Sequence, residues 1–203
     1  MSITTVLFDF DGVVADTEPL YDIFWGQIAE KYHIGIPDFS AKIKGTTLQR
    51  IYKLYFSDYS SEEHEKITRA CEEYEETMDF PEVKGAVQFL HMLKAKGFRV
   101  GLVTSSYRIK MERALKLLGL ETVFDTMVTA DRITAGKPDP MCYLLAARDL
   151  QVKPGECVVF EDSFSGIQKA IRAELFLVTR YFPPGISFQY SFSESTSNPF
   201  SVN

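Results

Sequence analysis

Five short apolar runs that alternate with helical segments constrain the fold of this chain more than any other feature. Interpreted as strands, the runs span residues 4–8, 99–103, 126–128, 156–160 and, with the weakest pattern, 175–179. Apolar residues recur at helical spacing between them, in residues 83–96, 109–118 and 140–150. Strands of continuous apolar character separated by helices are typical of parallel sheets that are buried on both faces. The sequence therefore predicts an α/β fold with a doubly wound parallel sheet.

One long segment interrupts this alternation. Residues 17–82 follow the first predicted strand and show helical patterns without a convincing strand. Two apolar faces can be read in it, one made by Leu20, Ile23, Phe24 and Ile28, the other by Ile67, Cys71, Tyr74 and Met78. We expect Asp16 and Thr17 to cap the first of these helices, ahead of Pro19. Residues 17–82 are thus expected to form a helical cap, inserted into a Rossmann-like core of residues 1–16 and 83–180.

The charge of the chain excludes some classes of partner. Among its 203 residues, 22 Lys and Arg stand against 28 Asp and Glu, which gives a net charge of −6. A chain with this balance lacks the basic excess that attracts nucleic acids and anionic membranes. It contains no apolar run near the roughly 20 residues that cross a bilayer, and residues 1–8 lack the basic start of a secretory signal. We expect a cytoplasmic protein without nucleic-acid or membrane partners.

Polar residues follow the predicted strands. Asp9, Asp11 and Gly12 come after the first, Thr104, Ser105 and Ser106 after the second, Lys137 in the loop after the third, and Glu161, Asp162 and Ser163 after the fourth. Ligands of open α/β sheets collect at the carboxyl ends of the strands, so these groups are candidates for one site. Taken singly, residues 104–106 and 161–162 could cap helices, and Lys137 could be an exposed lysine. Their joint occurrence favours a site.

Three carboxylates among these residues predict a metal site. Alternation along the first strand lets Asp9 and Asp11 point into a common space, which Asp162 can enter from a neighbouring strand. Clustered carboxylates repel one another unless a cation lies among them, and oxygen ligands suit Mg²⁺ better than zinc. The predicted strand ends carry none of the histidines, which are His33, His64 and His91.

A carboxylate pair, a hydroxyl and a lysine beside Mg²⁺ suit phosphoryl transfer. Asp9 could attack phosphorus and form an aspartyl phosphate. Asp11 could protonate the leaving alkoxide and then deprotonate the water that hydrolyses the intermediate. Thr104 and Lys137 would hold the phosphoryl oxygens, whose charge the metal and Lys137 would offset. These four residues are the expected catalytic set.

Five motifs carry a resemblance to a known family. They are FDFDGV at residues 8–13, DTEPLY at 16–21, VTSS at 103–106, GKP at 136–138 and FEDSFSGI at 160–167. In this order and spacing, over residues 1 to about 170, the chain resembles the haloacid dehalogenase superfamily and, within it, the β-phosphoglucomutase-like phosphatases that have a helical cap. The resemblance implies Asp9 as nucleophile and metal ligand, and Asp11 as acid/base with its backbone carbonyl on Mg²⁺. It also implies a mobile cap that carries specificity.

The same resemblance extends the set of expected site residues. It places Thr104 and Lys137 on the phosphoryl group and Asp162 on the metal. We expect the substrate, a small phosphate ester, to be bound by Gly12, Ser105, Lys137, Thr46 and Arg50. We expect Glu161 and Ser163 to lie directly behind the metal ligands.

Departures from individual branches of the superfamily favour hydrolysis. The dehalogenases lack an aspartate at the position of Asp11. The phosphoglucomutases carry a histidine where Tyr21 stands and an arginine shortly after the cap's Lys-Gly, where this chain has Leu48 and only the shifted Arg50. We therefore expect a phosphatase that acts on a sugar-type phosphate monoester. A sugar-phosphate mutase and a catalytically silent phosphate-binding homologue are the alternatives.

The identity of the substrate is left open by the sequence. Spacing does not rank the candidate specificity residues of the cap, which are Trp25, Thr46, Thr47 and Arg50. Lys44 and Lys53 leave phosphonate hydrolysis as a further alternative function, because phosphonate hydrolases use a cap lysine. The oligomeric state is also open, and a monomer is compatible with the sequence.

The end of the chain departs from the family pattern. After residue 168 the usual small residues and glycine are missing. Residues 181–203 contain six Ser, six Phe or Tyr, and Glu194 as the one charged residue. An aromatic tail packed on the core and a shifted reading frame that replaced the usual end are equally good interpretations of this segment.

Overall fold

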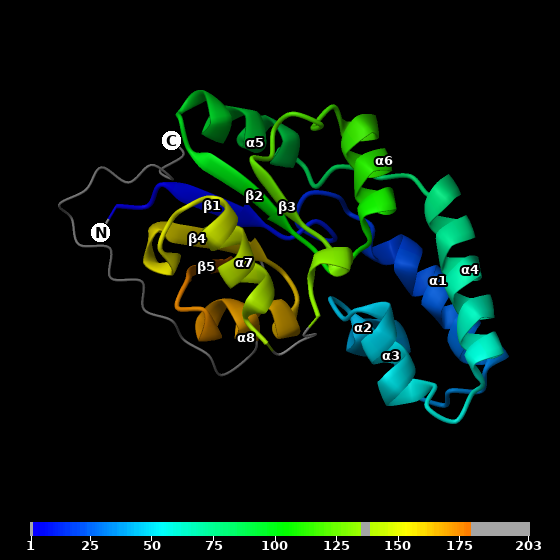
Figure 1. The fold of residues 1–203 in the computed structure, drawn as a ribbon. Coiled ribbons are helices and arrows are strands. Elements are labelled where there is room, and N and C mark those ends of the chain that lie inside the picture. The colour runs from blue at the N-terminus through cyan, green and yellow to red at the C-terminus, as the bar shows by residue number, and fades with distance from the viewer. Residues whose placement is uncertain (1, 135–138, 180–203) are drawn as a thin grey trace.

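The computed structural model describes residues 2–134 and 139–179. Within them, five parallel strands form one sheet in the order β3-β2-β1-β4-β5 (Figure 1). The strands are β1 (Thr5–Phe8), β2 (Arg99–Val103), β3 (Thr126–Val128), β4 (Cys157–Glu161) and β5 (Phe176–Thr179). Each predicted apolar run is a strand, so the predicted α/β class with a parallel sheet is confirmed.

The central strand β1 pairs with β2 and β4 along its whole length. Phe8, its last residue, lies opposite Leu102 on one side and Phe160 on the other. The N–H of Asp9 continues this pairing and donates to the carbonyl of Phe160 at 3.0 Å. Because the strands are parallel and level, the residues that follow β1, β2 and β4 emerge at the same edge of the sheet.

Helices cover both faces of the sheet. α5 (Ala86–Ala95) and α6 (Arg108–Leu118) lie on one face, and α7 (Met141–Asp149) and α8 (Phe164–Arg172) lie on the other (Figure 1). Side chains of β1 alternate between them, since Val6 packs in the cluster that contains Leu90 of α5, whereas Leu7 packs in the cluster that contains Tyr143 of α7. Two short 3₁₀ helices span Ala130–Arg132 and Pro154–Glu156. Burial on both faces explains why the strand sequences are continuously apolar.

A helical cap is inserted between β1 and α5. It consists of α1 (Glu18–Lys31), α2 (Phe39–Ile43), α3 (Leu48–Tyr55) and α4 (Ser61–Thr77). These helices pack around a separate apolar cluster in which Phe24, Phe56 and Ile67 are buried. Figure 1 shows the cap beyond the carboxyl edge of the sheet. In the part of the chain that the structure describes, no helix is long and apolar enough to cross a membrane.

Some local expectations differ from the structure. Ile23 is 58% exposed, because the buried face of α1 is formed by Phe24, Trp25 and Ile28 instead. The helix expected at 83–96 begins only at Ala86, after Gly85 in a left-handed conformation. Thr17 precedes α1 but makes no side-chain cap, because its hydroxyl donates to Asp11. The expectations for Lys137 and for residues 181–203 lie outside the described residues.

Candidate functional site

Asp9 and Asp11 flank a buried aromatic residue directly after β1. Phe10 is fully buried, whereas Asp9 and Asp11 both line one cavity. The N–H of Phe10 donates to Asp9 Oδ1 at 2.8 Å, which orients the Asp9 carboxylate at the strand end. The alternation read from the sequence thus brings both aspartates to a shared space.

Gly12 allows the loop after β1 to approach a second carboxylate. Its φ of 77° lies in the left-handed region, which glycine adopts without strain. A Cβ at this position would lie 2.0 Å from Asp162 Oδ2. Gly12 does not belong to the described residues that line the cavity, and its contact with the substrate stays a prediction.

Three buried carboxylates gather at this edge of the sheet. They belong to Asp9, Glu161 and Asp162, and one oxygen from each lies within 4.8 Å of the other two. The sequence reasoning expected the side chain of Asp11 in this group and Glu161 behind it. Among the described residues, the group contains Glu161 in place of Asp11, because the Asp11 carboxylate is engaged elsewhere.

The donor set of this cluster fits a hard divalent cation. Asp162 Oδ1 is buried and has no hydrogen-bond partner within the described residues, which is costly for a polar atom unless a ligand satisfies it. Burial raises the pKa of Asp162, and hydrogen bonding to Lys44 opposes this shift. Carboxylate oxygens without His or Cys match Mg²⁺ better than zinc. Asp9 and Asp162 would hold the ion, with Glu161 beside them.

Glu161 is held by three groups. The hydroxyl of Tyr143 donates to Glu161 Oε2 at 2.7 Å, and the N–H and hydroxyl of Ser163 donate to Oε1 at 2.9 and 2.6 Å. A Cβ at Gly166 would lie 2.0 Å from Glu161 Cδ, so the first turn of α8 also packs against this carboxylate. Ser163 further caps α8 by accepting from the N–H of Gly166 at 3.1 Å. These contacts fix the orientation of Glu161.

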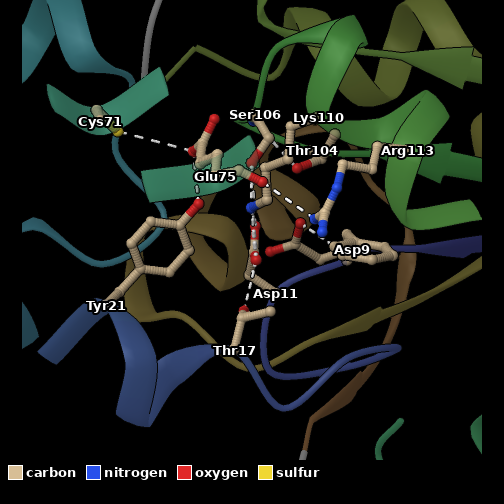
Figure 2. A network of polar contacts seen from close by, with 11 residues as sticks. Asp9, Asp11, Thr17, Tyr21, Cys71, Glu75, Thr104, Ser106, Lys110 and Arg113 are labelled. Atoms are coloured by element: carbon tan, nitrogen blue, oxygen red, sulfur yellow. Dashed lines mark hydrogen bonds and ion pairs between the residues drawn. The ribbon is translucent and has the colours of Figure 1, made fainter. Parts of the chain in front are cut away.

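The carboxylate of Asp11 is bound by Lys110, a residue that the sequence reasoning missed. Lys110 Nζ lies 2.7 and 2.8 Å from the two Asp11 oxygens, and the hydroxyls of Thr17 and Ser106 donate to the same carboxylate at 2.5 and 3.0 Å (Figure 2). The helical spacing in the sequence gives a signal for this residue, because Lys110 lies one helical turn before the buried Ala114 on the apolar face of α6. A lysine in such a position indicates a buried partner.

A cavity of about 280 Å³ lies between this edge and the cap. From the core, Thr104 and Ser105 line it, as expected from the second strand end, and Thr46 lines it from the cap. Arg50 lies elsewhere, since it lines a second cavity of about 330 Å³ together with Lys53. The structure therefore brings Thr46 together with five of the expected core residues, but not Arg50; the five are Asp9, Asp11, Thr104, Ser105 and Asp162.

The cap contacts the core through polar groups around the cavity. Lys44 Nζ lies 2.9 Å from Asp162 Oδ2 and also binds Glu18. Burial disfavours the charged form of Lys44, but these two hydrogen bonds outweigh it and raise its pKa. The hydroxyl of Ser105 donates to the carbonyl of Gly45 at 3.1 Å. The cap thus lies directly over the carboxylate cluster.

The cap side of the cavity is acidic. It is lined by the carboxylates of Glu18, Asp22, Glu72 and Glu75. Glu75 accepts from the hydroxyl of Tyr21 at 2.6 Å and from the thiol of Cys71, as Figure 2 shows. Burial raises the pKa of Glu75, an effect that the nearby Lys110 charge reduces. Lys44 is the one cationic residue among the described residues that line this cavity.

Comparison with known families decides where this chain belongs. The model of the haloacid dehalogenase-like hydrolases matches residues 6–179, which is most of the chain. The chain belongs to this family.

Relatives of this haloacid dehalogenase-like hydrolase include sugar phosphatases and mutases. A phosphorylated carbohydrates phosphatase from Thermotoga maritima is 36% identical over 177 residues, which cover 81% of this chain and 79% of the relative. A β-phosphoglucomutase from Bacillus subtilis is 30% identical over 185 residues, with 85% and 81% covered. The crystal structure of β-phosphoglucomutase from Clostridium difficile is similar with a TM-score of 0.75 at 27% identity, covering 87% of this chain and 84% of that one. The resemblance read from the motifs is thereby confirmed.

Proposed function

We propose that this protein is a Mg²⁺-dependent phosphatase that hydrolyses a small sugar-type phosphate monoester through an aspartyl phosphate on Asp9. The chain is a phosphoric monoester hydrolase of its family, since relatives along most of its length include a phosphatase of phosphorylated carbohydrates. One observation carries the finer proposal. Asp9 belongs to the three-carboxylate cluster and also lines the cavity that Asp11 lines.

In the first step, a carboxylate oxygen of Asp9 attacks phosphorus. The bond from phosphorus to the ester oxygen breaks, and Asp11 in its protonated form gives its proton to the departing alkoxide. The hydroxyl of Thr104, a residue that lines the same cavity, donates to a phosphoryl oxygen. Lys137 is proposed for the same task.

In the second step, water attacks the phosphorus of the aspartyl phosphate. The carboxylate of Asp11 takes a proton from this water, the bond between phosphorus and the Asp9 oxygen breaks, and inorganic phosphate leaves. Asp9 returns to a carboxylate and Asp11 to an acid, so protons and charges balance over the cycle. When bound by Asp9 and Asp162, Mg²⁺ would offset the charge of the phosphoryl oxygens.

The lining of the cavity favours a hydrolase over a mutase. A mutase must hold the second phosphate of a bisphosphate intermediate, which requires a cationic clamp in the cap. Here the cap side of the cavity carries four carboxylates, and Arg50 lines a different cavity. Lys44, the one cation among the described lining residues, is already paired with Glu18 and Asp162. A second anionic group would be repelled by this wall. The similarity to β-phosphoglucomutases keeps the mutase as the second candidate.

The proposal is tested by phosphate release from glucose 1-phosphate, glucose 6-phosphate, fructose 1-phosphate and glycerol 3-phosphate. We expect release that EDTA abolishes and that Asp9→Asn reduces by at least roughly 10⁴-fold, as for a lost nucleophile. Asp79→Asn, a matched change at an exposed position, should keep full activity. Full activity of Asp9→Asn would refute the mechanism. Conversion of glucose 1-phosphate to the 6-phosphate faster than phosphate release would favour the mutase.

A further inference from the structure

A lysine is almost completely buried beside the candidate site. Lys110, in the first turn of α6, has 1% of its side chain exposed. Burial of a cation costs free energy unless the cation is paired, and an apolar residue of similar volume would avoid this cost. The other buried residues of α6 are Met111, Ala114 and Leu115. Packing of the helix therefore does not by itself require a charge at position 110.

The ammonium of Lys110 contacts both oxygens of one carboxylate. Nζ lies 2.7 Å from Asp11 Oδ1, 2.8 Å from Asp11 Oδ2 and 2.9 Å from the hydroxyl oxygen of Ser106. Ser106 donates to Oδ2 at 3.0 Å, and Thr17 donates to Oδ1 at 2.5 Å. The three donors come from different segments, namely the start of α1, the loop after β2, and α6. Asp11 is thus held from several sides, with Thr17 opposite Ser106 and Lys110 (Figure 2).

Lys110 reaches Asp11 from the interior of the protein and not from the cavity. Asp11, Ser106 and Tyr21 line the cavity, whereas Lys110 does not belong to the described residues that do. Its ammonium lies 4.7 Å from the centroid of the Tyr21 ring, on α1 of the cap. Lys110 therefore acts on groups that face the substrate without facing it itself.

We propose that Lys110 is a positioning residue, which fixes the ionised carboxylate of Asp11 in the orientation in which it takes a proton from the attacking water. This inference rests on the proposed function, in which Asp11 is a carboxylate in the second step and accepts that proton. An aspartate side chain rotates about two torsions, and one ammonium in contact with both oxygens removes that freedom. Such precision matters, because a misplacement of about 1 Å can lower a rate about 100-fold.

The test is a double-mutant cycle of Lys110→Met and Asp11→Asn. kcat and KM are measured with whichever of the four esters named above turns over fastest. We expect Lys110→Met to lower kcat roughly 10- to 100-fold. KM should stay within about threefold, because Lys110 does not contact the substrate. In the Asp11→Asn background the same substitution should lower kcat by less than about twofold, because no carboxylate is left to hold.

Two controls separate this role from a structural one. Lys116→Met removes the same charge from an exposed position on the same helix, and its kcat should stay within about twofold of wild type. Circular dichroism and thermal unfolding establish that each variant is folded. Should Lys110→Met not fold, Lys110→Arg, which keeps the charge but displaces the donors, enters the same cycle with the same criteria.

Two results would overturn the inference. One is an unchanged kcat in a folded Lys110 variant, and the other is an equal loss of kcat in both backgrounds. Either can occur while Asp9→Asn is inactive and the proposed function stands. An active Asp9→Asn refutes the proposed function itself, so the two failures are distinguishable.

Discussion

Gly12 and Asp162 lie so close together that the loop after β1 and the end of β4 leave no room for a Cβ. Such an atom at residue 12 would lie 2.0 Å from Asp162 Oδ2 and 2.7 Å from its Cγ. Asp162 is one of the three clustered carboxylates. Any side chain at position 12 must therefore displace a candidate metal ligand.

This relationship predicts the effect of Gly12→Ala on metal binding. Both Gly12 and Gly85 have positive φ, 77° and 84°, but a Cβ at Gly85 would meet nothing within 4 Å. Each alanine variant should lose about 1–2 kcal/mol of unfolding free energy through backbone strain. Gly12→Ala should in addition raise the Mg²⁺ concentration for half-maximal activity, measured by titration, whereas Gly85→Ala should not. An equal Mg²⁺ requirement in the two variants would contradict this account.

Tyr143→Phe tests the support of Glu161. Burial raises the pKa of Tyr143 well above its usual value, so its hydroxyl remains a donor to Glu161 at neutral pH. Removal of a hydrogen bond that orients a carboxylate of a metal site typically costs about 10-fold in metal affinity. We expect Mg²⁺ binding, measured by calorimetry, to weaken by roughly this factor. Tyr59→Phe, which removes a hydroxyl bound to a carbonyl inside the cap, should leave it unchanged, and a Tyr143→Phe protein with wild-type affinity would argue against the role of this contact.

Glu75→Gln tests the cost of a partly buried carboxylate in the cap. Burial raises the pKa of Glu75 above its usual value near 4.5, although Lys110 and the Tyr21 hydroxyl oppose the shift. Because the folded state favours the protonated form, the stability that Glu75 contributes is present below its unfolded pKa and is lost as pH rises through its folded pKa. Glutamine resembles the protonated form at every pH. The difference in the free energy of unfolding between the variant and wild type should therefore increase in favour of the variant from pH 5 to pH 8.

Urea unfolding at these two pH values measures the effect of Glu75→Gln. Glu73→Gln, at an exposed position of the same helix, serves as the matched control and should show no such gain. A difference between Glu75→Gln and wild type that stays constant with pH would mean that burial does not disfavour the ionised form of Glu75.

The sheet and the positions of several site residues could be predicted because they depend on local periodicity. A run of apolar residues identifies a strand buried on both faces, and the residue that follows it must emerge at the carboxyl edge. This pattern alone predicts that Asp9 and Thr104 lie at that edge. The left-handed turn at Gly12 and its approach to Asp162 could not be predicted in this way, because they depend on the path of two loops.

The limits of the sequence are clearest in the carboxylates. Alternation predicts that Asp9 and Asp11 leave the strand on the same side, but it does not say what each carboxylate meets there. The tertiary structure places Glu161 in the cluster and pairs Asp11 with Lys110, which comes from 99 residues further along the chain. It also directs Arg50 away from the main cavity.

The sequence by itself determined the succession of strands and helices along the chain, the edge of the sheet at which polar residues collect, and the family. Each of these follows from short-range patterns and motifs. Only the tertiary structure decided which carboxylates cluster, which lysine holds Asp11 and which cap residues face the cavity. Those choices depend on the rotation of packed helices and on approaches of a few ångströms between distant segments, and burial and charge pairing set them only once the whole chain is folded.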